Sequence, residues 1–167
     1  PSSPLGGDFT EVLAANKRLM LFAKQHNIPI FFTTVVYDTP EQASVFRQRL
    51  PDFNILQRDS HWVNIHDELK GFVEANNLLE KNHPSAFFNT DLHEKLKKYD
   101  IDSLIITGLT SSGCVRASCV DGLQYNYSCI VISDACGDRN PQAHDMSLHD
   151  MHAKYAQVMT VVEMINR

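Results

Sequence analysis

The sequence predicts an α/β fold in which helices cover both faces of a parallel sheet. Apolar, β-prone runs alternate along the chain with segments whose apolar residues recur at helical spacing. The run IPIFFTTVVY at 28–37 is apolar on both faces, which is typical of a strand covered from two sides. Strands that alternate with helices favour a parallel arrangement. No repeat or linker divides the 167 residues, so we expect one domain over residues 1–167.

The first half of the chain carries signals for two strands and for the helices around them. Asp8 and Glu11 have capping-box spacing at the start of a helical pattern, and Thr90 can cap a later helix. The loops between 50 and 76 follow no clear period. The expected elements are, in order, a helix at 8–27, a strand at 28–37, a short helix near 41–49, a strand at 77–81 and a helix at 90–99.

The second half alternates more regularly. Pro141 stands where the first turn of a helix tolerates proline. The expected elements are a strand at 103–107, a helix at 114–126, a strand at 128–133, a helix at 141–156 and a strand at 158–162. In such folds ligands bind at the carboxyl ends of the strands. Two chemically useful side chains are expected there: Cys114, after strand 103–107, and Lys81, which ends strand 77–81.

Composition excludes several classes of protein. The formal net charge is −5, and the one dense cationic patch, at 95–98, lies beside acidic residues, which argues against a nucleic-acid or anionic-membrane surface. No apolar run approaches the ~20 residues that a membrane span needs. The four cysteines lie at 114–136 without CxxC spacing. This pattern indicates reduced thiols in the cytoplasm and neither disulfides nor a zinc site.

The position of Cys114 suggests a nucleophile. A thiol attacks as the thiolate, and the unpaired N–H groups and dipole at the first turn of a helix favour that anion. A nearby ammonium such as that of Lys81 would favour it further. The alternatives are that Cys114 is a small buried apolar residue and that Lys81 is a solvated lysine at a strand end.

Two segments resemble the isochorismatase-like cysteine hydrolase family. TGLTSSGCVRASCVDGLQYNYSCIVISDACGDR at 107–139 resembles the family's nucleophile segment, and KNHPSAFFNTDL at 81–92 resembles its lysine segment. The likeness covers nearly the whole chain, and within the family it points to the amidohydrolases related to N-carbamoylsarcosine amidase. The resemblance implies a three-layer α/β/α sandwich around a six-stranded, mostly parallel sheet. It also implies a homo-oligomer, a dimer or a tetramer.

Active members of the family use an Asp–Lys–Cys triad. The resemblance assigns the nucleophile to Cys114 and the lysine to Lys81. The family's aspartate ends a first strand just before a PSSPLG-type loop, but in this chain that loop begins at Pro1 and Asp8 lies on its far side. We therefore expect the domain to lack its N-terminal strand here, and we expect both the strand and the aspartate upstream of Pro1. A sheet without that strand would have two unpaired strand edges.

The resemblance also suggests residues that contact the substrate. It implies an oxyanion hole made by the backbone N–H groups of Thr110 and Cys114, with a cis peptide at Leu109–Thr110. Arg139 aligns with an arginine that binds a substrate carboxylate; its alternative is an ion pair with Asp134 or Asp138. Aromatic side chains can wall a small pocket or belong to the core. The aromatic candidates are Trp62, Phe87 and Phe88.

We expect no metal or other cofactor. His144, His149 and His152 share one expected helix, but no HExxH motif accompanies them. Some nicotinamidases of the family hold zinc through an Asp–x–His element after the second strand, whereas here Asp38 has no histidine at that spacing.

These observations favour a cysteine amidohydrolase that acts on a small linear amide or carbamoyl compound, of the N-carbamoylsarcosine, maleamate or ureido-acid type. A carboxylate on that substrate is expected. Two alternatives stay open: a nicotinamidase-type hydrolase of ring amides, and a catalytically silent homologue that serves as a binding or assembly subunit.

Overall fold

A computed structural model describes residues 4–167 of the chain. Its strands form two parallel sheets, one with the order β1-β2 and one with the order β3-β4-β5. The strands are β1 (Phe32–Val35), β2 (Leu78–Lys81), β3 (Ser103–Leu109), β4 (Ser128–Gly137) and β5 (Gln157–Met159). The α-helices are α1 (Thr10–Gln25), α2 (Ser44–Arg49), α3 (Leu92–Lys98), α4 (Arg116–Gln124), α5 (Pro141–Lys154) and α6 (Val161–Ile165).

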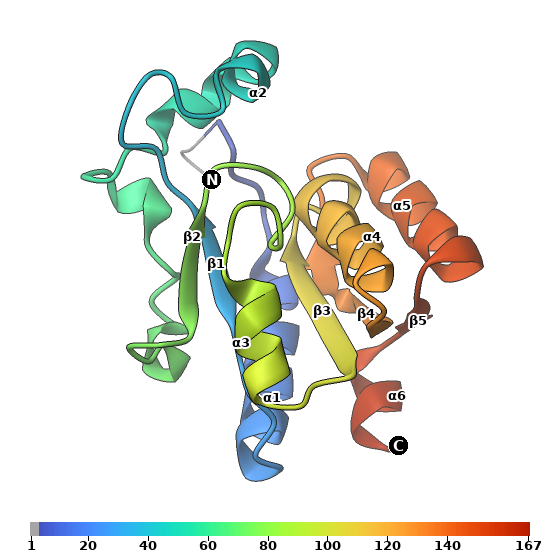
Figure 1. Cartoon of the computed structure of the whole chain (residues 1–167). Helices are drawn as coiled ribbons and strands as arrows, with labels where there is room; N and C mark the ends of the chain where they lie inside the picture. Colours follow the sequence, from blue (N-terminus) through green and yellow to red (C-terminus); the bar gives the residue numbers. More distant parts are fainter. Residues whose placement is uncertain (1–3) are drawn as a thin grey trace.

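Helices cover both faces of the β3-β4-β5 sheet, so the expected layered α/β class is confirmed (Figure 1). On one face α1 and α6 bury a small cluster that includes Leu19, Ile132 and Val161. On the other face α3, α4 and α5 bury a larger cluster that includes Leu96, Cys119 and the fully buried Met151. Burial on both faces explains the apolar central runs of β3 (104–106) and β4 (129–132).

The described strands number five and lie in two sheets, whereas the resemblance implied one six-stranded sheet. Within residues 4–167, β1 pairs only with β2, and β3 pairs only with β4, so one edge of each is open. In the view of Figure 1, α3 lies in front of the space between the two strand groups and α1 lies behind it. Two open edges are what we expected of a sheet that lacks one inner strand, and that strand itself stays an expectation.

Several element boundaries differ from the sequence-based prediction. The first helix begins at Thr10, because the Asp8 carboxylate accepts hydrogen bonds from the Thr10 N–H (3.2 Å) and hydroxyl (2.8 Å) and does not form a capping box with Glu11. The first strand covers only Phe32–Val35 of the expected 28–37. β4 extends to Gly137, past the expected end at 133, through an irregular register between Ile106 and Gly108 of β3.

The C-terminal strand prediction was wrong in its second half. β5 ends at Met159, and α6 follows at once. Thr160 and Glu163 form a full capping box at the start of α6, and the Asp134 carboxylate accepts the Val161 N–H (2.8 Å). These polar contacts satisfy the N–H groups of a first helical turn, which outweighs the β preference of the valines.

The four cysteines are free thiols, and three of them are buried. Among residues 4–167, none of the helices combines the length and the hydropathy that crossing a bilayer requires.

Candidate active site

Lys81 ends β2 as a buried ammonium. Its side chain is only 4% exposed, and Nζ donates hydrogen bonds to the backbone carbonyls of His83 (2.9 Å) and Pro84 (2.6 Å). The chain turns sharply after β2, so that these carbonyls face back toward the strand end. A buried charge needs such partners, and the carbonyl dipoles supply them. The alternative interpretation, in which Lys81 is a solvated lysine at a strand end, is therefore wrong.

Cys114 lies in a single π-helical turn, Ser111–Val115, between β3 and α4. The expected helix at 114–126 thus begins as this turn and continues as α4 from Arg116. Cys114 is partly exposed, unlike the other three cysteines. The turn folds back on Thr110, whose carbonyl accepts the N–H groups of Gly113 (3.0 Å) and Val115 (3.1 Å). Turns of this kind recur at functional sites.

The structure brings Lys81 and Cys114 together from segments 33 positions apart in the chain. Burial lowers the pKa of Lys81, while the charge and hydrogen bonding of Cys114 act in the opposite direction. Burial is the larger effect, because water solvates the ammonium better than two carbonyls and one sulfur do. Their meeting places the carboxyl end of β2 and that of β3 at the same edge of the molecule.

The segment after Lys81 is also tied to the helix that follows Cys114. The Ala86 N–H donates to the Ser118 hydroxyl (2.9 Å), one helical turn beyond Cys114. Thr90 donates its hydroxyl proton to the Ala86 carbonyl (2.5 Å), which closes the loop before α3. The SAF portion of the lysine segment therefore fixes the lysine loop against the nucleophile helix.

The cis peptide that the resemblance implies is present directly before this turn, between Leu109 and Thr110.

Ser112, within the turn, is held from the end of β4, because the Asp138 carboxylate accepts its N–H (2.9 Å) and its hydroxyl (2.6 Å). Burial raises the pKa of Asp138, but the hydrogen bonds from Ser112 and from neighbouring backbone groups outweigh it and leave the pKa below its usual value.

Arg139 is exposed, and its guanidinium donates to the Leu5 carbonyl (3.1 Å). Among residues 4–167, Arg139 forms no ion pair with Asp134 or Asp138, whose carboxylates accept from Val161 and Ser112 respectively. Arg139 therefore joins the end of β4 to the N-terminal loop.

The three aromatic candidates have different surroundings. Phe87 is 6% exposed and stacks on Tyr125 (ring centroids 5.3 Å apart) within the larger core cluster, as its alternative reading described. Trp62 is 38% exposed and packs against His61 on the surface. Phe88 is half exposed and meets the ring of His83 edge-on (4.8 Å), which places it beside the lysine loop.

Sequence reasoning missed Tyr37, which follows β1 and is fully buried. Its hydroxyl donates to the Asn82 carbonyl (3.1 Å), and the Arg47 guanidinium lies over its ring (4.5 Å to the centroid). Burial raises the pKa of Tyr37; Arg47 lowers it and Cys114 raises it. Tyr37 is thus a neighbour of the thiol. The sequence feature that could have indicated Tyr37 is its position at the end of the VVY run, because the parallel strand beside it ends at Lys81.

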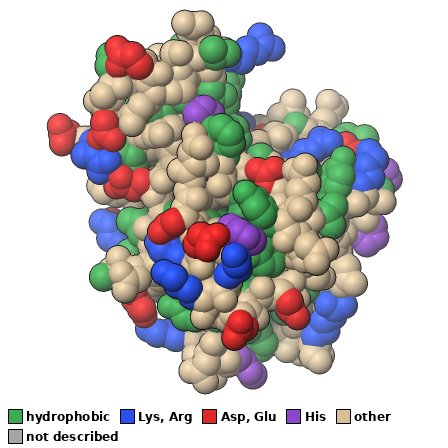
Figure 2. All heavy atoms as spheres, viewed as in Figure 1, with side chains coloured by type: hydrophobic (Ala, Val, Ile, Leu, Met, Phe, Trp, Pro, Cys, Tyr) green, Lys and Arg blue, Asp and Glu red, His purple; other side chains and the backbone are tan. Residues whose placement is uncertain are grey.

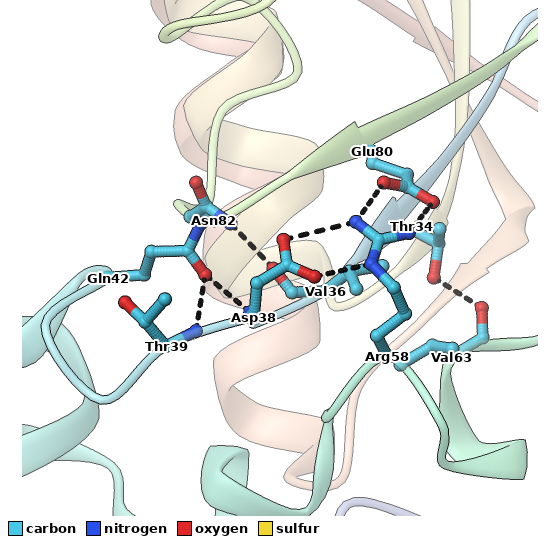
Figure 3. Close-up of polar contacts among 9 residues, drawn as sticks. All are labelled: Thr34, Val36, Asp38, Thr39, Gln42, Arg58, Val63, Glu80 and Asn82. Atoms are coloured by element: carbon cyan, nitrogen blue, oxygen red, sulfur yellow. Dashed lines mark hydrogen bonds and ion pairs between the residues drawn. The ribbon is translucent and has the colours of Figure 1, made fainter.

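Asp38, which has no histidine at the spacing of the family's zinc element, is paired with the Arg58 guanidinium (Figure 3). Arg58 contacts both carboxylate oxygens of Asp38 and both of Glu80, the latter at 2.9 and 2.8 Å. The two carboxylates raise the pKa of Arg58. The Gln42 side-chain oxygen accepts the Asp38 N–H (2.5 Å), so Asp38 is held on both sides. This network joins strand β2 to the irregular segment that follows β1.

Within residues 4–167, no three His, Cys, Asp or Glu side chains cluster so as to hold a metal ion. His144 instead contacts Ser111, and the His152 ring nitrogen accepts the Val158 N–H (3.3 Å).

An open cavity of about 410 Å³ lies alongside the site. Pro84 of the lysine loop lines it, together with Ser112 and Gly113 of the nucleophile turn and the first residues of α4. Figure 2 shows the surface hollowed between the segment that contains α2 and the layer of α4 and α5.

Comparisons with known proteins agree with this architecture. The family model for the isochorismatase domain matches residues 2–163. The N-carbamoylsarcosine amidase of Arthrobacter sp is 30% identical over 165 residues, which cover 95% of this chain and 62% of that protein. The maleamate amidohydrolase of Pseudomonas putida is 34% identical over 59% of this chain and 54% of its own length. The chain thus spans less than two thirds of the length of these curated relatives.

Among solved structures, a cysteine hydrolase from Pseudomonas syringae pv. phaseolicola 1448A superposes with a TM-score of 0.90. The alignment covers 99% of this chain and 84% of that one, at 21% identity, so it supports the fold. Taken with the match of the family model over nearly all residues, these similarities show that the chain belongs to the isochorismatase domain family.

Proposed function

We propose that the protein is a cysteine-dependent amidohydrolase in which Cys114 is the nucleophile and Lys81 its cationic partner. One observation carries the proposal: a buried ammonium and a partly exposed thiol meet at the carboxyl edge of the strands, where α/β folds bind ligands. A buried ammonium without a carboxylate partner is costly, and such groups concentrate at functional sites.

The proposed reaction has two halves. The Cys114 thiolate adds to the amide carbon, and the resulting oxyanion accepts hydrogen bonds from the N–H groups of Thr110 and Cys114. The C–N bond then breaks, the nitrogen takes a proton and leaves as ammonia, and a thioester remains on Cys114. Water adds to the thioester and releases the acid and the thiol. No step is assigned to a metal.

The proton carrier of this reaction is proposed to be an aspartate upstream of Pro1. It would accept the thiol proton and pass it to the leaving nitrogen. Asp8 is not a candidate, because its carboxylate is exposed and is bound to Thr10 at the start of α1.

The relatives and Arg139 support the proposed substrate class. The two named relatives are amidases of carboxylate-bearing compounds, so we propose a small linear amide or carbamoyl compound with a carboxylate. Arg139 would bind that carboxylate through its guanidinium. Trp62 and Phe88 are the candidate aromatic walls of the substrate pocket. The proposal includes a homo-oligomer in the cytoplasm, which light scattering and localisation of the full-length protein can test.

The experiment is a panel of small amides scored by ammonia release with full-length protein. The panel contains acidic linear amides, neutral linear amides and nicotinamide. We expect turnover of an acidic linear amide by the wild type and none by Cys114→Ala. Preference for nicotinamide would instead support the ring-amide reading, and lack of any turnover would support the silent binding subunit.

A further inference from the structure

The first residue of the nucleophile turn has a buried polar contact that the proposed mechanism does not use. Ser111 is fully buried, and its hydroxyl oxygen lies 3.1 Å from the Gly137 carbonyl oxygen and 2.7 Å from Nδ1 of His144. Gly137 ends β4, and His144 lies in the first turns of α5. The contact therefore joins the turn that bears Cys114 to the connection between β4 and α5.

The direction of these two hydrogen bonds follows from their chemistry. A carbonyl oxygen can only accept, so the single hydroxyl proton of Ser111 points to Gly137. With the hydroxyl proton so placed, the hydroxyl oxygen accepts from His144 in the imidazole form that carries a proton on Nδ1.

His144 is well placed to act as a fixed anchor. The Asn140 side chain caps α5 by accepting the N–H groups of Gln142 (2.9 Å) and Ala143 (3.3 Å). The His144 N–H itself donates to the Asn140 carbonyl (3.0 Å). The backbone that carries the imidazole is thus fixed by a capped first helical turn.

We propose that Ser111 and His144 are positioning residues that hold the Cys114 turn in its reactive orientation. Ser112 and Asp138 anchor the next position, so consecutive residues of the turn are held from the same β4–α5 connection. Cys114 follows Ser111 by three residues in a single π-helical turn, so rotation at Ser111 moves the sulfur relative to Lys81. The inference deepens the proposed function, since it takes Cys114 as the reacting group.

The test compares variants that remove the anchor with one that restores it. Ser111→Ala removes the hydroxyl, and His144→Leu removes the donor. His144→Asn keeps an N–H donor close to the place of Nδ1. His149→Leu is the matched control, because His149 is exposed on the same helix. The readouts are the rate of Cys114 alkylation by iodoacetamide, followed by peptide mass spectrometry, kcat and KM on the best amide, and the melting temperature.

We expect Ser111→Ala and His144→Leu to slow alkylation and kcat by about 10- to 100-fold, the loss that a displaced reacting group produces. KM should stay within about twofold, because the substrate contacts remain. His144→Asn should recover most of the rate, and His149→Leu should behave as the wild type. A lower melting temperature with unchanged alkylation and kcat would overturn the inference and leave a purely structural role.

The outcomes separate this inference from the proposed function. If the wild type hydrolyses no amide, the alkylation rates still decide whether the anchor controls the thiol. If the wild type hydrolyses an amide and the two anchor variants retain its kcat, the positioning role is wrong while the hydrolase proposal stands.

Discussion

Replacement of Lys81 by methionine is the most informative single change at the site. Lys81→Met keeps an unbranched side chain of similar length in a buried place and removes only the ammonium. The His83 and Pro84 carbonyls lose their donor, at a cost of about 1–3 kcal/mol for each acceptor left unpaired. The desolvation cost of the charge disappears at the same time. These contributions oppose each other, so we expect a small change in melting temperature and a larger change in the reactivity of the Cys114 thiol.

The effect on Cys114 is larger. Lys81 hydrogen-bonds to Cys114, so the substitution removes the cation that contacts the reacting sulfur. We therefore expect Lys81→Met to slow iodoacetamide alkylation of Cys114 at neutral pH by about tenfold or more. The three buried cysteines serve as the internal reference for folding. Lys97→Met is the control, because Lys97 is 57% exposed on α3. Equal alkylation of Cys114 in the wild type and in Lys81→Met would refute the reasoning.

The lowered pKa of Lys81 also predicts a pH effect with a definite sign. Between its folded pKa and the ordinary value of 10.5, the unfolded chain keeps a proton that the folded chain has lost. The free energy of unfolding therefore gains from this group as the pH rises through that window. Denaturation of the wild type and of Lys81→Met at several alkaline pH values measures it. The difference in favour of the wild type should grow toward pH 10.5, and a shrinking difference would contradict the assignment.

Three other changes test separate parts of the structure. Arg58→Met should make the segment at 38–76 more sensitive to limited proteolysis without changing Cys114 alkylation, because it removes the bond between that segment and β2; unchanged cleavage would argue against the fastening role. Met151→Ala should destabilise the fold by about 2–5 kcal/mol, since Met151 is fully buried, and calorimetry should show a melting temperature lower by about 4–20 °C. Arg139→Ala should reduce kcat/KM for acidic amides far more than for neutral ones; equal losses would assign Arg139 to the contact with Leu5.

The sequence was sufficient for those features that depend on local pattern. Apolar runs with helical segments between them predicted the order of strands and helices, and the same pattern placed Lys81 and Cys114 at strand ends. Parallel strands present their carboxyl ends at one edge, so two local signals were enough to predict that Lys81 and Cys114 lie close together.

Features that depend on distant partners could not be predicted in this way. The contact of Ser111 with His144 joins residues 33 positions apart, and Arg58 meets Glu80 across an irregular segment. Phe87 belongs to the core because Tyr125 stacks on it, which no local period reveals. The final helix α6 was missed for a similar reason, since its first turn is supported by Asp134, which lies on another strand.

The most direct measurement asks where the substrate becomes covalently attached. Full-length protein is mixed with the best amide from the panel, quenched in acid within the first turnovers and digested for peptide mass spectrometry. The account predicts a thioester on Cys114 whose mass increase equals the amide minus ammonia, and it predicts no turnover by Cys114→Ser. Normal ammonia release by Cys114→Ser, or an acyl group found only on another residue, would contradict it.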